Sequence, residues 1–240
     1  METKLLFQTD AYCREFKSVV EETDPQRNGI TLSETVFYPG GGGQPADFGI
    51  IQDKDRIVKV TGFDKSQGNQ WHIIDGILPI KGSEVWGTID WERRYQLMRT
   101  HTAMHILCGV IWRDFKAMVT GGNMEPLQGR MDFEFENMTS NLVGEIENKI
   151  NAEIKQARDI KVAILPREEA ERIPDLIRTK INLLPKDLKF IRTVEIKGLD
   201  LQADGGTHVN NTREVGQIII LDYQSKGKIN KRLKIRITDP

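Results

Sequence analysis

Two histidines stand four residues apart in the segment THTAMHIL. His101 and His105 fall where apolar residues recur every three or four positions, which predicts a helix. Residues at i and i+4 lie on one helix face, about 6 Å apart, so both imidazoles could reach one metal ion. No glutamate lies between them, which separates the pattern from the H-E-x-x-H of zinc proteases. The spacing alone is also typical of helix histidines that pack or face solvent.

A third histidine lies in a second motif, DLQADGGTHVNNTREVG. His208 follows Asp204 by four residues, and Gly205-Gly206 between them permits a tight turn. Three imidazoles and one carboxylate would close a tetrahedral zinc site. Three imidazoles alone would leave a position open for water or substrate, as in catalytic zinc sites. The alternative is that GGTH is a plain turn, with Asp204 as its Asx-type stabiliser.

Two other side chains are weaker candidates for metal ligands. Cys108 follows His105 by three residues, but a helix rarely supplies three ligands from consecutive turns, so we expect a buried structural thiol. His72, beside Trp71 in a predicted strand, is expected to be structural. Because only two cysteines are present, a disulfide framework is excluded and a reducing cytoplasmic setting is expected.

A run of glycines between two prolines, Pro39-Gly40-Gly41-Gly42-Gly43-Gln44-Pro45, is unusual for a compact domain. Four consecutive glycines cost conformational entropy on folding. They suit a loop that another backbone, such as the end of a nucleic-acid strand, must approach closely. No Gly-Lys-Ser/Thr follows, so the run is not a P-loop. The alternative is a flexible hairpin loop.

The elements expected to position these residues divide the chain near Ile89 to Trp91. Residues 1–90 predict a small β-barrel, since short β-rich runs alternate with turn residues. These runs are Gly29 to Tyr38, Phe48 to Gln52, Arg56 to Gly62, Gln70 to Asp75 and Glu84 to Ile89. The only helix considered in this part lies around Cys13 to Glu22.

Residues 91–240 predict a two-layer α/β domain, which makes the whole chain α+β. Helices are expected at Trp91 to Met118 and at Ser140 to Arg158, with Ser140 as an N-cap. A Gly-rich turn is expected at Thr120 to Asn123, and Pro166 is expected at the first position of a short helix. The predicted strands are Arg130 to Glu136, Lys161 to Leu165, Leu188 to Lys197, Val215 to Tyr223 and Lys228 to Thr238.

Composition narrows the classes of protein. The 240 residues carry a formal net charge of -1, with 29% charged and 38% hydrophobic residues. No apolar run approaches the roughly 20 residues of a membrane span, and the N-terminus lacks the apolar core of a secretory signal. Basic residues nevertheless gather at the C-terminal end, between Lys226 and Arg236. They either contact phosphates or protect a solvated edge strand.

Taken together, these motifs resemble the editing domain of alanyl-tRNA synthetase and its free-standing relatives, the AlaX proteins. The resemblance covers nearly the whole chain, and the barrel with its Gly-rich loop is similar to the medium-length type. Four ordered segments carry it, namely FYPGGGGQPADFG, RTHTAMHIL, VTGGNMEPLQGRMDFEF and DLQADGGTHVNNTREVG.

The resemblance implies a zinc enzyme that hydrolyses mischarged tRNA(Ala), chiefly seryl-tRNA(Ala) and secondarily glycyl-tRNA(Ala). It implies a barrel similar to the second domain of elongation factor Tu, no membrane and no obligate protein partner. It makes His101, His105 and His208 zinc ligands, with Asp204 at a position where the family usually has cysteine. Thr120 would sense the substrate hydroxyl. Contact with substrate or tRNA would involve Gly40, Gly41, Gly42, Gly43, Gln44 and Arg99.

Three other functions stay open at this point. The chain could be an editing deacylase for another mischarged tRNA such as seryl-tRNA(Thr), because threonyl-tRNA synthetase has a related editing domain. It could be a non-catalytic, zinc-stabilised RNA-binding module, which full closure of the site by Asp204 would favour. A generic metallohydrolase is the third, and the basic residues near the first histidine pair and at the C-terminus speak mildly against it.

Overall fold

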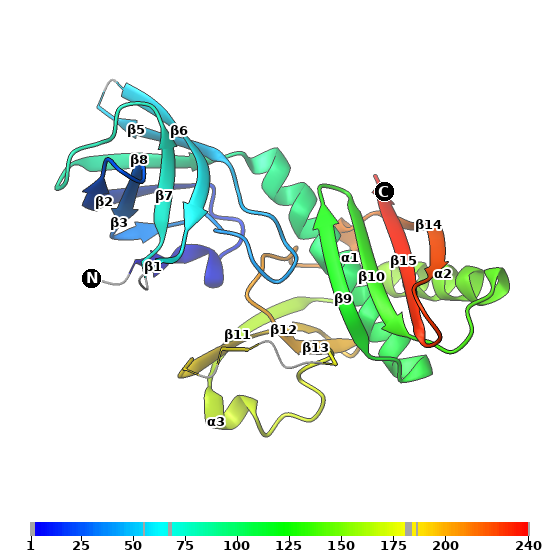
Figure 1. The fold of residues 1–240 in the computed structure, drawn as a ribbon. Helices are drawn as coiled ribbons and strands as arrows, with labels where there is room; N and C mark the ends of the chain where they lie inside the picture. The colour runs from blue at the N-terminus through cyan, green and yellow to red at the C-terminus, as the bar shows by residue number, and fades with distance from the viewer. Residues whose placement is uncertain (1–2, 55, 67–68, 181–183, 186, 240) are drawn as a thin grey trace. The chain divides into compact units, whose positions relative to one another are not determined.

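The computed structural model describes residues 3–54, 56–66, 69–180, 184–185 and 187–239 (Figure 1). Its contacts divide the chain into two compact units. The first holds residues 1–41 and 45–95, and the second holds residues 42–44 and 96–240. The short piece 42–44 of the Gly-rich loop therefore belongs to the second unit. No helix in the described ranges has the length and apolar character to cross a membrane.

The first unit is a closed six-stranded barrel, which confirms the predicted small β-barrel. Its strands follow one another in the order β2-β3-β7-β6-β5-β8. Alternating inward side chains fill the interior with apolar residues, among them Ile30, Leu32, Phe37 and Ile51, which are fully buried. The strands are β2 (Glu15–Asp24), β3 (Gly29–Leu32), β5 (Gly49–Asp53), β6 (Arg56–Asp64), β7 (Trp71–Asp75) and β8 (Glu84–Ile89).

A short two-stranded piece lies outside the barrel circuit. It pairs β1 (Lys4–Leu5) in parallel with β4 (Glu34–Thr35), and the 3-10 helix η1 (Leu6–Gln8) follows β1. The helix considered around Cys13 to Glu22 was wrong, because β2 occupies this segment. Phe16, Ser18 and Val20 point inward at every second position, so the period is that of a strand.

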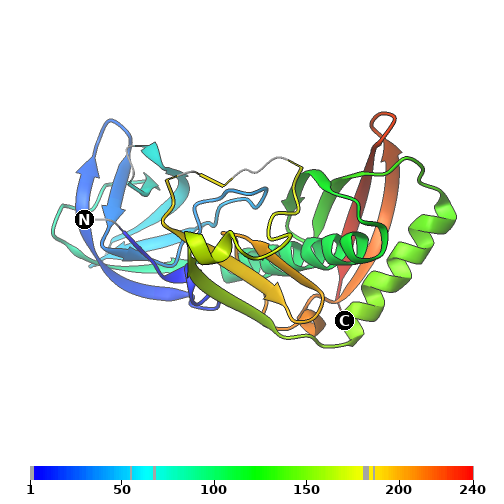
Figure 2. The ribbon, with the colours of Figure 1, turned by 90° about the horizontal axis from the view of Figure 1, so that it is seen from below.

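The second unit contains one long helix between two antiparallel sheets (Figures 1 and 2). The helix is α1 (Trp91–Phe115), whose first turn belongs to the barrel unit. One sheet has the order β14-β15-β10-β9, formed by β9 (Val119–Glu125), β10 (Gln128–Glu134), β14 (Gln217–Ser225) and β15 (Asn230–Thr238). The other has the order β11-β12-β13, formed by β11 (Ile160–Pro166), β12 (Phe190–Ile196) and β13 (Asp200–Ala203).

Small residues let both sheets approach α1. A Cβ added at Gly129 of β10 would lie 3.0 Å from the Met104 sulfur on α1. On the other side, a Cβ added at Gly109 of α1 would lie 3.0 Å from the Asp200 side chain. The helix is therefore buried on opposite faces, which explains why its apolar residues form more than one stripe.

Several local predictions needed correction. Thr120 to Asn123 is not a turn, because these residues lie within β9 and pair with β10. The N-cap of α2 (Ser140–Lys155) is Thr139, whose side chain accepts from the Leu142 amide. Pro166 precedes the short helix α3 (Arg167–Ala170) as its N-cap instead of beginning it. Neither β13 nor the 3-10 helix η3 (Thr212–Glu214) is predicted from the sequence.

Candidate metal centre

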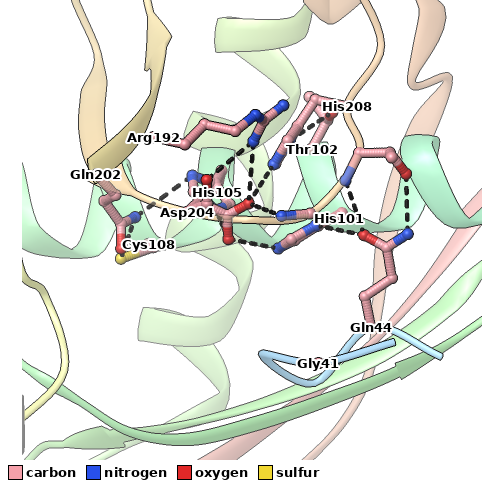
Figure 3. Close-up of polar contacts among 12 residues, drawn as sticks. Gly41, Gln44, His101, Thr102, His105, Cys108, Arg192, Gln202, Asp204 and His208 are labelled. Atoms are coloured by element: carbon pink, nitrogen blue, oxygen red, sulfur yellow. Dashed lines mark hydrogen bonds and ion pairs between the residues drawn. The ribbon is translucent and has the colours of Figure 1, made fainter. Parts of the chain in front are cut away.

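Four side chains that are distant in the sequence converge inside the second unit (Figure 3). His101 and His105 come from consecutive turns of α1, while Asp204 and His208 come from the segment that follows β13. One potential ligand atom from each residue lies within 4.8 Å of all the others. All three imidazoles are buried. The four residues named as candidate ligands from the sequence therefore lie together, and they could hold a metal ion.

The inner nitrogens of all three rings face one carboxylate. From Nε2 to the nearer Asp204 oxygen the distances are 3.3 Å for His101, 3.7 Å for His105 and 3.1 Å for His208. Ligands at about 2.0–2.1 Å from a tetrahedral zinc ion are themselves about 3.4 Å apart. The three nitrogen–oxygen distances, two to Oδ2 and one to Oδ1, lie on either side of this value.

Each ring uses its outer nitrogen for another bond. Nδ1 of His101 lies 2.9 Å from Gln44 Oε1, and Nδ1 of His105 lies 3.1 Å from Asp200 Oδ2. These oxygens only accept, so both Nδ1 atoms carry the proton and both Nε2 atoms are free to coordinate. Nδ1 of His208 shares a hydrogen bond of 3.3 Å with the Thr102 hydroxyl. The surrounding residues thus fix the ring orientations that a metal site needs.

Burial and the neighbouring charges act in opposite directions on the pKa values of Asp204 and His105. Burial alone would raise the pKa of Asp204, but the charge and hydrogen bonds of the histidines hold it well below its usual range. Burial lowers the pKa of His105, yet hydrogen bonds and charges from Asp200 and Asp204 outweigh it and raise that pKa to about 9. For His208, burial and repulsion by His101 keep the pKa well below normal.

The turn before His208 is fitted closely to the first histidine. The Gly206 amide donates to Asp204 Oδ1 at 2.6 Å. Asp204 therefore stabilises an Asx-type turn and also presents its carboxylate to the histidines. A Cβ added at Gly206 would lie 2.4 Å from His101 Cε1 and 2.6 Å from Gln44 Oε1. Arg192 of β12 donates to the backbone oxygen of Asp204 at 2.9 Å. Only glycine fits at position 206 in this conformation.

The Gly-rich run has a conformation that requires glycine. Gly40, Gly41, Gly42 and Gly43 have φ values of 83°, 143°, 57° and 89°, all in the region that disfavours side chains. Within the second unit, Gly43 accepts from the Met124 amide at 3.2 Å. The run is therefore a shaped segment, which argues against the flexible-loop alternative.

Gln44, which ends this run, is buried and fully engaged by the protein. Its Oε1 accepts from the Thr207 amide at 3.0 Å as well as from His101, and its Nε2 donates to Thr207 Oγ1 at 2.8 Å. These contacts favour a role in orienting His101. Sequence reasoning expected contact with substrate or tRNA at Gln44, and that contact stays a prediction.

The other predicted residues lie apart from the four-residue cluster. Cys108 is a buried thiol whose pKa burial raises well above normal, and it accepts from Gln202, in accordance with a structural role. Thr120 Oγ1 donates to Asn230 Oδ1 at 2.8 Å on an exposed part of β9. Arg99 is buried and donates to Val215 O and Thr238 O, both at 3.0 Å. The contacts of Arg99 favour a structural role, and its RNA contact stays a prediction.

The basic C-terminal segment is not an edge strand. β15 lies between β14 and β10, so the explanation by edge protection was wrong. Lys231 is buried with its ammonium on the Gly227 and Lys228 carbonyls. Arg232 pairs with Asp132 through two hydrogen bonds, of 2.7 and 2.8 Å. Part of the positive charge is thus neutralised locally.

Two supporting residues escaped the sequence analysis. Asp200, which orients His105, stands four residues before Asp204 and lies on β13, which pairs with β12. Thr102, next to His101, supports His208 and also accepts from the Val209 amide at 3.3 Å. The doubled aspartates of DLQAD were the one available signal for Asp200.

Comparisons with known proteins agree with this architecture. Residues 191–234 match the family described as threonyl and alanyl tRNA synthetase second additional domain, and residues 3–93 match class II (A) tRNA synthetases. Alanyl-tRNA editing protein AlaX-M from Saccharolobus solfataricus is 40% identical over 96% of this chain and 97% of its own length. The protein of that name from Methanosarcina barkeri is 35% identical over 99% and 100%. Alanine--tRNA ligase from Ignicoccus hospitalis is 39% identical over 91% of this chain and 24% of its own. Near-complete coverage at this identity means that the chain belongs to the AlaX-M family of alanyl-tRNA editing proteins.

Proposed function

We propose that this chain removes the amino acid from mischarged tRNA(Ala), chiefly from seryl-tRNA(Ala) and secondarily from glycyl-tRNA(Ala), at a zinc site. As a member of the AlaX-M family it is an enzyme, an aminoacyl-tRNA deacylase. The observation that carries the proposal is the convergence of three imidazole Nε2 atoms on the Asp204 carboxylate. The names of the relatives indicate that the tRNA is tRNA(Ala).

The donor set suits zinc. Nitrogen from imidazole and oxygen from carboxylate are both ordinary zinc ligands, and one such atom from each residue lies within 4.8 Å of the others. When bound, zinc would supply a concentrated positive charge for ester hydrolysis. His101, His105 and His208 would hold it, with Asp204 contributing one oxygen.

The chain's own residues would keep this centre rigid. Gln44, Asp200 and Thr102 each bond an outer imidazole nitrogen, so the rings need little reorganisation when the substrate ester arrives. The glycines at 40–43 leave the backbone bare of side chains, which suits close passage of the 3′ end of a tRNA.

One competing function has specific support. Four protein donors can saturate a tetrahedral zinc ion, which is typical of structural sites, and this favours a non-catalytic RNA-binding module. The strength of Asp204 as a zinc ligand distinguishes the deacylase from the non-catalytic module. As a carboxylate already bonded to the Gly206 amide, Asp204 binds zinc less strongly than the usual thiolate and is more easily displaced.

The proposal is tested by deacylation of a panel of acylated tRNAs. The panel contains seryl-, glycyl- and alanyl-tRNA(Ala) together with seryl-tRNA(Thr), and each is incubated with and without a chelator. We expect serine to be released fastest from tRNA(Ala), and release to stop in the chelator and resume on adding zinc. Metal content is measured on the same samples by mass spectrometry.

Matched variants give the test its control. His101→Ala should lose both the metal and the deacylation, whereas Cys108→Ala, which removes a buried thiol outside the cluster, should keep one metal ion per chain. Failure to release any amino acid from any member of the panel, with zinc bound, would establish the non-catalytic module instead. Preferential release from tRNA(Thr) would overturn the substrate assignment.

A further inference from the structure

The outer face of the barrel carries an exposed tryptophan within a hollow. Trp86 lies on β8, where every second side chain points inward, and it faces outward with 48% of its surface exposed. Its direct cross-strand partners are Lys17 on β2 and Gln52 on β5. Directly opposed residues share one face of a sheet, so these three side chains form one row across three strands.

The hollow around this row is large and edged by cations. It has a volume of about 940 Å³. Residues of the 80–86 segment line it, together with Lys17 and Gln52, the cross-strand partners of Trp86. Lys17, Lys54 and Lys81 line it, against a single acidic side chain, Glu84. Glu84 pairs with Lys17 at 2.9 Å. In the described part of the barrel, Lys54 and Lys81 have no ion-pair partner, so the hollow keeps an excess of positive charge.

The exposed indole and the lysines without ion-pair partners indicate which kind of ligand the hollow can bind. A nucleic-acid base can stack on an aromatic face while its phosphates approach the surrounding ammonium groups. A purely apolar protein surface would bury Lys54 and Lys81 without partners, which is costly. A double helix does not fit, because its bases are already stacked inside and cannot reach Trp86.

We infer that this hollow is a second RNA-binding site, which stacks an unpaired nucleotide on Trp86 and holds its phosphates with Lys54 and Lys81. The inference rests on the proposed function only in identifying the RNA as an unpaired region of the tRNA substrate. The barrel then contributes substrate affinity through residues of the first unit alone.

The test measures binding of a labelled single-stranded RNA 12-mer to the full-length chain. We expect Trp86→Ala to weaken binding about tenfold, and Trp86→Phe, which keeps an aromatic face, to stay within about threefold of the wild type. Lys54→Ala combined with Lys81→Ala should weaken binding and make it less dependent on salt. Annealing the 12-mer to its complement should also weaken binding.

Intrinsic fluorescence localises the contact. RNA should quench the tryptophan emission of the wild type, and the quenching should be largely lost in Trp86→Phe. Of the other three tryptophans, Trp71 is buried, and Trp91 and Trp112 are half-buried and do not line the hollow. Ile77→Ala and Lys4→Ala serve as controls, because both side chains are exposed on the same unit but do not line the hollow. Circular dichroism and thermal unfolding show that each variant is folded.

The outcomes separate this inference from the proposed function. Wild-type affinity and quenching in a folded Trp86→Ala variant would overturn the second site, whatever the enzyme hydrolyses. His101→Ala should still bind the 12-mer and show the quenching. A wild type that releases no amino acid but shows Trp86-dependent binding would overturn the proposed deacylase and leave the RNA site standing.

Discussion

The side-chain oxygen of Gln44 accepts a hydrogen bond from Nδ1 of His101 at 2.9 Å, across 57 residues of sequence. This bond sets which ring nitrogen carries the proton, so it orients the His101 lone pair toward Asp204. Residues 42–44 of the Gly-rich run therefore belong to the same unit as the candidate metal centre.

The bond predicts that Gln44 controls metal affinity. Gln44→Ala should lower zinc affinity about 10–100-fold, the range found when a ligand's supporting hydrogen bond is removed. Competition with a chromogenic chelator measures the change. Gln217→Ala, an exposed glutamine of the same unit, is the control and should bind zinc as the wild type does. Equal affinities for both variants would contradict the orienting role.

Asp204 offers a test of ligand chemistry. Asp204→Asn keeps an oxygen for the Gly206 amide but removes the negative charge, so zinc affinity should fall at least tenfold. Asp204→Cys should instead bind zinc more tightly than the wild type, because thiolate is the stronger donor. Isothermal titration with zinc measures both. If Asp204→Asn bound zinc like the wild type, the carboxylate would not be a ligand.

Adjacent glycines should respond in opposite ways to the same substitution. Gly206→Ala would push a methyl group into His101 and Gln44, and should abolish metal binding and lower the melting temperature by several degrees. Nothing lies within 4 Å of a Cβ added at Gly205, so Gly205→Ala should retain the metal. Metal content and thermal unfolding check the pair. Similar behaviour of the two variants would contradict the close packing of the turn on His101.

Thr120 remains the predicted sensor of the serine hydroxyl. Its own hydroxyl bonds Asn230 in this structure, so recognition of serine would require it to share or exchange that bond. Thr120→Val should reduce the preference for seryl- over alanyl-tRNA(Ala) about 5–100-fold, the cost of one lost polar contact. Thr120→Ser should preserve it. The ratio of deacylation rates is the measurement, and an unchanged ratio in Thr120→Val would end the assignment.

The barrel should lose stability in mild acid through His72. Burial lowers the pKa of this fully enclosed imidazole to about 4, whereas an unfolded histidine has a pKa of about 6.5. Between about pH 6.5 and about pH 4 the unfolded chain binds a proton at His72, whereas the folded barrel does not. The free energy of unfolding should therefore fall as the pH drops from about 6.5 to 4, by about 3 kcal/mol in total.

Urea unfolding at a series of pH values measures this effect. His72→Gln keeps an acceptor for the Thr35 hydroxyl but cannot titrate, so its stability should depend less steeply on pH in that interval. The difference between the two slopes isolates His72 from the three histidines of the metal centre. Parallel slopes would show that His72 is not buried as a neutral ring.

The sequence by itself indicated the four candidate donors of the centre and the class of fold. The four donors and the glycine run are local patterns whose residue types have few alternative uses. The barrel and α1 follow from alternation of period two and from helical spacing, which are also local properties. These signals were sufficient for the family resemblance, for the small β-barrel and for naming the four candidate donors.

Only the tertiary structure decided what supports those donors. Gln44, Asp200 and Thr102 reach their histidines across 57, 95 and 106 residues, and no local pattern encodes such a pairing. Thr120 to Asn123 looked like a turn because glycine marks turns locally, yet β10 and Met104 on α1 make those glycines part of a packed strand. Non-local packing overrides local propensity wherever two elements must approach closely, and here that happens on both sides of α1.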